Sequence, residues 1–159
     1  MAEARAPRLF VDADACPVKE ECLRVAGRHG AEVLLVSNGG IRPVADPLVQ
    51  IVVVPDGPDE ADKWIADRTG PGDICITADI PLAARVVESG ARVLKPNGEA
   101  LTAQNVGQAL AMRDLMTDLR AANPLSQGGG QRPFSKADRS RFLDALERQL
   151  RLAAADRRP

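Results

Sequence analysis

The sequence predicts an α/β fold with three layers, in which helices cover both faces of a mainly parallel central sheet. Short apolar runs rich in Val, Ile and Leu alternate along the chain with helix-like segments, and turn residues separate the two kinds of segment. The 159 residues suffice for one domain with a sizeable core. We therefore expect a single domain over residues 1–159, with its core at about 8–121.

The expected elements follow in order along the chain. The expected strands are "LFVDA" (9–13), "EVLLVS" (32–37), "IVVVP" (51–55), "ICIT" (74–77) and "RVLK" (92–95). The expected helices cover residues 17–29, 59–69, 80–89, about 103–121 and about 136–152. Pro17 suits the first turn of a helix. Gly30, Gly70 and Gly90 stand where the first three helices should end.

Two sequence signals mark the starts of the last two helices. Thr102 is expected to cap the long helix, and Ser135 with Asp138 forms a variant of the capping box before the final one. The Gly-rich segment 123–134 between them reads as a flexible connector. It is too short to form a second domain.

Composition narrows the class of protein. The net charge is −1, the longest aliphatic stretches are strand-sized, and the first residues contain no apolar signal-peptide core. We expect a cytoplasmic protein with no membrane partner. Its three cysteines, an odd number without paired metal-binding spacing, are expected to be reduced thiols.

Aspartates follow three of the expected elements at the same edge of the sheet. Asp12 and Asp14 end the first strand, Asp59 and Asp62 begin a helix after the third, and Asp79 follows the fourth. In an extended strand, Asp12 and Asp14 would share a face, roughly 6 to 7 Å apart. Ligands of open parallel sheets bind beyond the carboxyl ends of the strands. Carboxylates gathered there suit Mg²⁺ or Mn²⁺.

Structural explanations compete for some of these aspartates. Asp59 and Asp79 are both suitable helix N-caps. Asp12 is hardest to explain in this way, because a buried strand would ordinarily continue with Val or Ile. The single histidine, His29, stands at a helix end, where an exposed capping role is expected.

Several longer motifs carry a family resemblance. They are "VDADACPVK" (11–19), "DEAD" (59–62), "ITADIPLA" (76–83), "RVLKPNGEALT" (92–102), "AMRDLMTDLR" (111–120) and "GGGQRPF" (128–134). In order and spacing they resemble the YaiI/YqxD family of uncharacterised bacterial proteins, over roughly residues 9–150. That family is similar to the PIN-like group, whose better-known relatives are metal-dependent nucleases. The resemblance implies an acidic site formed by Asp12, Asp14, Asp62 and Asp79, with Asp59 as an outer member.

The function predicted on these grounds is metal-dependent phosphodiester hydrolysis, acting on RNA. Asp12 and Asp79 are expected to bind one Mg²⁺ or Mn²⁺ ion, with Asp14 and Asp62 completing that site or holding a second ion. Substrate contacts are expected from side chains at neighbouring strand ends and from three arginines. The residues are Ser37, Asn38, Thr77, Arg42, Arg113 and Arg120.

The C-terminal segment allows two interpretations. Residues 132–159 contain eight Lys/Arg and four Asp/Glu, a net charge of +4, so this segment is a candidate contact for the nucleic-acid backbone. The alternative is that an apolar stripe of one helix closes the core. That stripe consists of Phe134, Phe142, Leu143, Leu146 and Leu150.

Two other functions stay open at the level of sequence. The Asp-x-Asp pair, with Ser37 ending the second strand, resembles the haloacid-dehalogenase-type phosphatases, in which Asp12 would be the nucleophile and Asp14 the general acid and base. The lysine of that superfamily has only Lys63 and Lys95 as candidates. A non-catalytic module that binds metal or nucleic acid is the third interpretation.

Overall fold

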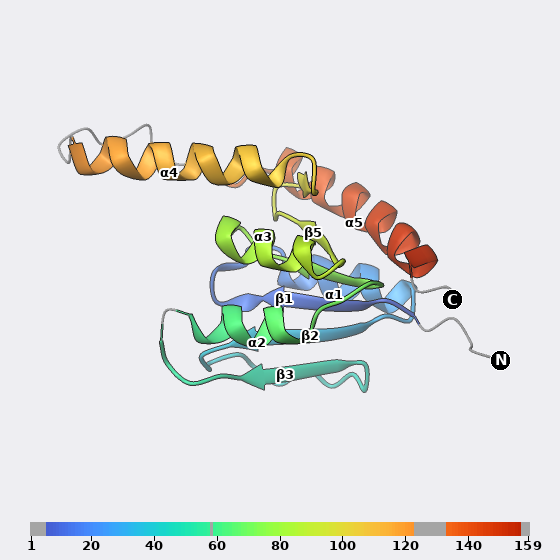
Figure 1. Ribbon diagram of the computed structural model, residues 1–159. Helices are drawn as coiled ribbons and strands as arrows, with labels where there is room; N and C mark the ends of the chain where they lie inside the picture. Colours follow the sequence, from blue (N-terminus) through green and yellow to red (C-terminus); the bar gives the residue numbers. More distant parts are fainter. Residues whose placement is uncertain (1–5, 58, 123–132, 157–159) are drawn as a thin grey trace.

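One six-stranded sheet with helices on both faces organises the protein (Figure 1). The structure is a computed structural model that describes residues 6–57, 59–122 and 133–156. The strands are β1 (Arg8–Asp12), β2 (Glu32–Ser37), β3 (Val49–Val53), β4 (Asp73–Ile76), β5 (Arg92–Leu94) and β6 (Ala100–Leu101). The helices are α1 (Lys19–Arg28), α2 (Glu60–Arg68), α3 (Ile80–Glu88), α4 (Val106–Ala122) and α5 (Lys136–Asp156). The predicted fold class is confirmed.

The strand order places β1 in the interior of the sheet. The order is β3-β2-β1-β4-β5-β6, and every neighbouring pair is parallel except β5 and β6, which are antiparallel. Side chains of β1 alternate between the two faces, so Leu9 and Val11 join the core beneath α1 and α5, while Phe10 joins the core beneath α2 and α3. All three are fully buried. This double burial explains the continuous apolar runs of the central strands.

Helix α5 closes one of the two cores. Phe142, Leu146, Leu150 and Ala153 recur along one face and are buried in the cluster that also contains α1. Of the two interpretations of the C-terminal segment, the structure supports the apolar stripe. The expected capping box is also present, because Ser135 N donates to Asp138 Oδ2 at 3.0 Å and Asp138 N donates to Ser135 Oγ at 3.1 Å.

Some predicted boundaries were wrong for local reasons. Thr102 does not cap α4: its N–H donates to Asn105 Oδ1 at 2.7 Å, and the helix begins only at Val106. This side-chain turn competes with helix formation over 103–105. Strand β3 lies two residues earlier than expected, and the short antiparallel strand β6 was not predicted.

Two further points concern segments outside these elements. Gly30 and Gly90 have positive φ, as a helix-ending glycine should, whereas Gly70 does not. Most of the predicted connector, residues 123–132, lies outside the described residues. In the part of the chain that the structure describes, no helix combines the length and apolar character needed to cross a bilayer.

Candidate functional site

Thr77 links two aspartates at the carboxyl edge of the sheet. Strand β1 ends at Asp12, and the neighbouring strand β4 is followed by Thr77. The Thr77 hydroxyl donates to Asp12 Oδ2 at 2.9 Å and accepts from the Asp79 N–H at 3.0 Å. Because Thr77 is buried, this hydroxyl is committed to holding Asp12 and the start of α3 in place.

Asp79 has the capping role that the sequence predicted and also belongs to the acidic group. Its Oδ1 accepts from Leu82 N at 3.0 Å, which caps α3. The carboxylate is thereby fixed at the end of the sheet, next to Asp12. Helix capping and membership of a functional site are compatible for this residue.

Asp62 completes a group of three carboxyls that interact electrostatically. Burial is the main cause that raises the pKa of Asp62 to about 6, and the charges of Asp79, Asp12 and Asp59 add to it. A hydrogen bond between the Asp62 and Asp79 side chains favours the protonated form further. Burial, opposed by the Thr77 hydrogen bond, also raises the pKa of Asp12. The structure therefore brings together Asp12, Asp62 and Asp79, which we call the acidic cluster.

The buried aspartate Asp73 has a basic partner, which the acidic cluster lacks. Asp73, at the opposite edge of the sheet, receives two hydrogen bonds from the Arg8 guanidinium, at 3.0 Å and 2.9 Å. Within residues 6–57, 59–122 and 133–156, no ion pair joins a Lys or Arg to any member of the acidic cluster. Hydrogen bonds from Thr77 and Leu82 N stabilise two of its carboxylates, but no positive charge balances them, which is the electrostatic condition of a site that attracts a cation.

The Asp14 side chain is held by a different neighbour, although its charge contributes to the raised pKa of Asp12. The strand ends at Asp12 and residues 13–15 form a 3₁₀ turn, so the expectation of two aspartates on one face of an extended strand was wrong. Both carboxylate oxygens of Asp14 instead accept from the Asn38 N–H, at 3.3 Å and 3.2 Å. Asp59 is exposed, and its contribution is the charge it adds to Asp62.

Three of the expected substrate contacts have structural roles. Thr77 positions Asp12, as described above. Ser37 is fully buried, and its Oγ accepts from Gly39 N at 3.0 Å. The Asn38 side chain donates to Pro55 O at 2.9 Å. The three side chains therefore hold the loops around the site, and their contact with a substrate stays a prediction.

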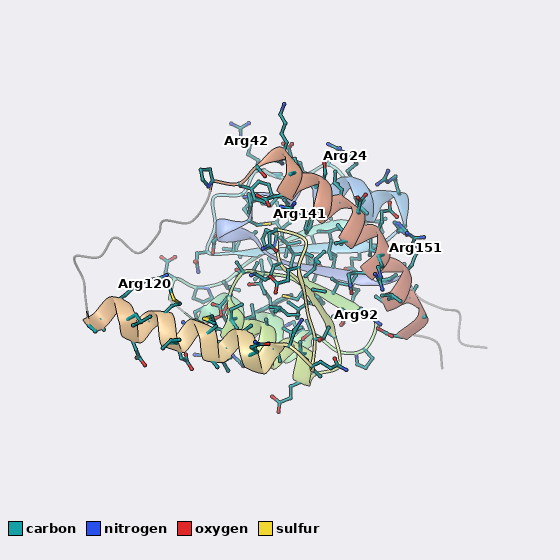
Figure 2. The ribbon with its side chains drawn as sticks, turned by 90° about the horizontal axis from the view of Figure 1, so that it is seen from above. Arg24, Arg42, Arg92, Arg120, Arg141 and Arg151 are labelled. Carbon is teal, nitrogen blue, oxygen red and sulfur yellow. The ribbon has the colours of Figure 1, made fainter. Side chains whose placement is uncertain are left out.

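Two of the predicted arginines line one groove beside the acidic cluster. Arg113 and Arg120, on α4, border a groove of about 460 Å³ together with Lys95, which follows β5 at the same sheet edge. Ile80, the residue after Asp79, lines its other wall. Arg42 is exposed elsewhere: Figure 2 shows it near the amino-terminal end of α5, away from Arg120.

Sequence reasoning missed two lysines near the site. Lys19 Nζ donates to Ala13 O at 3.3 Å, directly after Asp12. Lys95 entered the prediction only as a weak phosphatase candidate, yet it borders the groove and pairs with Glu99 at 3.4 Å. The spacing of Lys19 from Asp12 offered no signal, because the turn that returns the chain was read as extended strand.

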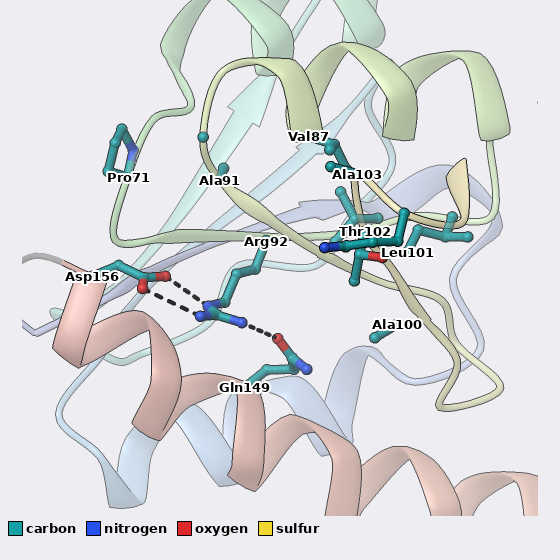
Figure 3. Close-up of a pocket in the computed structure, with 13 residues that line it drawn as sticks. Pro71, Val87, Ala91, Arg92, Ala100, Leu101, Thr102, Ala103, Gln149 and Asp156 are labelled. Carbon is teal, nitrogen blue, oxygen red and sulfur yellow. Dashed lines mark hydrogen bonds and ion pairs between the residues drawn. The ribbon is translucent and has the colours of Figure 1, made fainter. Parts of the chain in front are cut away.

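A larger hollow lies away from the acidic cluster. It measures about 490 Å³ and lies near Arg92, the first residue of β5 (Figure 3). The Arg92 guanidinium donates to Asp156 at 2.6 Å and 3.2 Å and to Gln149 at 3.5 Å. Since these bonds tie α5 to the sheet, we interpret the hollow as part of that junction.

Two of the basic residues of α5 are engaged in ion pairs. Arg139 pairs with the buried Glu21 of α1 at 2.6 Å, and Arg141 pairs with Asp138. His29, expected to be an exposed cap, is half-buried and lies 2.6 Å from Glu147 Oε2. His29 is the C-cap residue of α1, as expected, and only the expected exposure was wrong, because α5 packs over the end of α1. The net charge of +4 therefore overstates the charge available to a nucleic acid.

The donor atoms of the acidic cluster are of the kind that a hard divalent ion prefers, although the side chains are not arranged around an ion. Its donors are all carboxylate oxygens, and these carry charge that no basic residue of the described chain pairs with. Among the described residues, no three His, Cys, Asp or Glu side chains are arranged to hold a metal ion as they stand.

Comparison with known proteins identifies relatives along nearly the whole chain. The family described as "Uncharacterized BCR, YaiI/YqxD family" matches residues 10–152. A UPF0178 protein of Ruegeria pomeroyi is 68% identical over 93% of this chain and 96% of its own. UPF0178 proteins of Cereibacter sphaeroides and Nitrobacter winogradskyi are 70% and 54% identical, over 92% and 91% of this chain and 90% of each relative. No solved structure matches the sequence.

Proposed function

Because the chain belongs to the YaiI/YqxD family, whose description names no activity, we propose a function from the acidic cluster: metal-dependent hydrolysis of phosphodiesters in RNA. One observation carries the proposal. Asp12, Asp62 and Asp79 come from three separate segments. Burial raises the pKa of Asp12 and of Asp62, the charge of Asp79 adds to both shifts, and no ion pair with a described Lys or Arg compensates the three carboxyls. Structural acids are ordinarily paired, as Asp73 is with Arg8.

The three carboxylates of the acidic cluster would hold the Mg²⁺ or Mn²⁺ ion. Such an ion lowers the pKa of bound water and stabilises negative charge on phosphate oxygens. Asp14 is a weaker candidate ligand, because Asn38 N engages both of its oxygens. We therefore propose one ion at the acidic cluster, with Asp14 and Asp59 contributing negative charge from outside it.

Residues around the acidic cluster have defined parts in this proposal. Thr77 keeps Asp12 oriented, and the Leu82 N–H keeps Asp79 oriented. Both carboxylates are therefore already fixed in orientation before an ion binds. In the metal-free protein Asp62, with a pKa of about 6, takes up and releases a proton near neutral pH. This proton would leave when a cation binds.

The groove beside α4 supports nucleic acid as the substrate. Arg113 and Arg120 supply positive charge along it, Lys95 borders it paired with Glu99, and Ile80 lies directly after Asp79. Positive side chains spaced along a groove follow the phosphates of a nucleic-acid strand. We propose that the strand lies in this groove with one phosphate at the acidic cluster.

The phosphatase alternative receives less support from the geometry. Asp12 is held from the β4 side by Thr77, whereas Asp14 is held from the β2 side by Asn38. The two carboxylates are therefore directed to different neighbours, where that chemistry needs them on the same phosphate. Of its lysine candidates, Lys95 pairs with Glu99.

The deciding experiment compares RNA cleavage by matched variants. The intact chain is incubated with end-labelled single-stranded RNA and Mn²⁺, alongside Asp12→Asn, Asp79→Asn and the control Asp56→Asn, an exposed residue of the neighbouring loop. We expect cleavage by the intact chain and by the control, and a loss of at least about a hundredfold in the other two. Equal cleavage by Asp12→Asn and the intact chain would contradict the proposal.

Two further measurements separate the alternatives. Hydrolysis of p-nitrophenyl phosphate without RNA cleavage, with beryllofluoride protecting Asp12, would assign a phosphatase. Calorimetric binding of Mn²⁺ that Asp12→Asn abolishes, with no cleavage of either substrate, would assign a binding module.

A further inference from the structure

Strand β3 leaves one long edge of the sheet open. It occupies the end of the strand order, and β2 is its only strand neighbour in the described part of the chain. Val53 is 65% exposed, more than any other large apolar residue there, and Leu48 is 38% exposed. An open apolar edge is a template for pairing with another strand.

The backbone directions of β3 follow from two hydrogen bonds to β2. Val33 N donates to Leu48 O and Val54 N donates to Ser37 O, each at 2.8 Å. In a parallel ladder, alternate residues of a strand bond to the same neighbour. The N–H and C=O groups of Ile51 and Val53 therefore face away from the sheet.

Nothing in the sequence of this edge opposes pairing with an identical edge. Residues 47–55, "PLVQIVVVP", contain no charged side chain, although natural edge strands are commonly protected by Lys or other charges. Pro47 and Pro55 bound the pairing segment at both ends. The pairing segments of two copies therefore bring no charged side chains of their own against one another.

We propose that β3 pairs antiparallel with β3 of a second copy of this chain, forming a two-fold symmetric dimer with one continuous sheet. The outward N–H and C=O groups of Ile51 and Val53 form hydrogen bonds with the same groups of the second copy, as an isologous interface requires. Val53 becomes covered. Antiparallel pairing also places the two acidic clusters at opposite edges of the joined sheet, so their negative charges stay apart.

Sedimentation of the full chain over a concentration series tests this dimer. We expect a reversible dimer for the intact chain, and a dissociation constant raised at least about tenfold by Val53→Pro, which removes one outward donor from each copy. The side chain of Val53 is exposed and its N–H does not bond to β2, so the fold of the monomer should persist. Circular dichroism checks this.

Matched variants distinguish the edge from other surfaces. Val53→Thr keeps the N–H and the branched side chain, and it should dimerise like the intact chain. Leu115→Lys with Leu119→Lys, on the exposed side of α4, should also leave the dimer intact. A monomeric intact chain at about 200 μM, or a dimer broken by the α4 variant and kept by Val53→Pro, would overturn the proposal.

Discussion

The two long helices, α4 and α5, differ in what they do for the protein. Helix α5 has 21 residues and buries four apolar side chains in the core. Helix α4 has 17 residues, none of them buried, and it extends beyond the end of the sheet in Figure 1. Its exposed apolar residues are Met112, Leu115, Met116 and Leu119. Helix α5 therefore stabilises the fold, and helix α4 offers a surface.

The same contrast holds for their arginines. On α5, Arg139 and Arg141 pair with acids that are almost fully buried. On α4, Arg113 and Arg120 border an open groove beside the acidic cluster. The comparison teaches that the net charge of a segment does not locate a binding surface. The arginines that border this groove lie on the less basic helix.

The largest expected effect is on stability. Leu146→Ala should lower the free energy of unfolding by about 2–5 kcal/mol, because it leaves a cavity in the core beneath α5. Leu119→Ala, the matched change on α4, should alter it by less than about 0.5 kcal/mol. Urea denaturation measures both. Equal losses would mean that the apolar side of α4 is covered in solution.

The next effect concerns RNA binding. Arg113→Glu with Arg120→Glu should weaken binding about tenfold or more and flatten its salt dependence, since each lost phosphate contact removes about 0.7 from the log–log slope for single strands. Arg148→Glu with Arg151→Glu makes the same charge change on α5 and should have a smaller effect. Fluorescence anisotropy in Ca²⁺ measures affinity at several salt concentrations. A larger loss from the α5 pair would reverse the roles assigned to the helices.

Much of the fold was predictable, because the burial pattern repeats locally. The central strands are buried on both faces and read as continuous apolar runs, and the stripe of Phe142, Leu146 and Leu150 has helical spacing. Strand β6 has only two residues, too few to show an alternating apolar pattern. Thr102 resembled a cap because the competing bond from its N–H to Asn105 depends on the turn after β6.

The site was predictable as a set of segments and not as a geometry. The rule that ligands bind beyond the carboxyl ends of strands led to Asp12, Asp62 and Asp79. Asp14 was misplaced because a 3₁₀ turn begins directly after Asp12. The part of Thr77 in orienting Asp12 was not predictable, since a sequence does not show that its hydroxyl bonds to that carboxylate.

A smaller effect is expected at the acidic cluster, which adjoins the groove of α4. Asp62 has a pKa of about 6 in the folded chain against an ordinary value of 3.8, so the folded state binds more protons between these values and loses stability as pH rises through them. Asp62→Asn should therefore be more stable than the intact chain at pH ~7.5, by about 1 kcal/mol after allowance for solvent screening, and equal to it near pH ~4.

Thermal unfolding across this pH range, without divalent ions, measures the difference. Asp67→Asn, on the exposed side of the same helix, is the matched control and should follow the intact chain. An Asp62→Asn variant that is less stable at neutral pH would show that the carboxylate is compensated in solution, which would remove the argument for a cation at this edge.

The smallest effect concerns the contact that fastens α5 to the end of α1. The hydrogen bond from His29, at 2.6 Å, lowers the pKa of Glu147 in the folded chain. A lowered folded pKa means that this contribution is present above the ordinary pKa of the carboxyl and is lost as pH falls through the folded value. Because Glu147 is partly exposed, Glu147→Gln should cost only a few tenths of a kcal/mol at pH ~6 and nothing near pH ~3.

The matched change on α4, Asp114→Asn, removes the exposed pair with Arg113 and should leave the melting temperature unchanged at both pH values. A pH-dependent loss from Asp114→Asn as large as that from Glu147→Gln would mean that α4, too, is fastened by its charges, and the distinction between the two helices would then rest on their apolar faces alone.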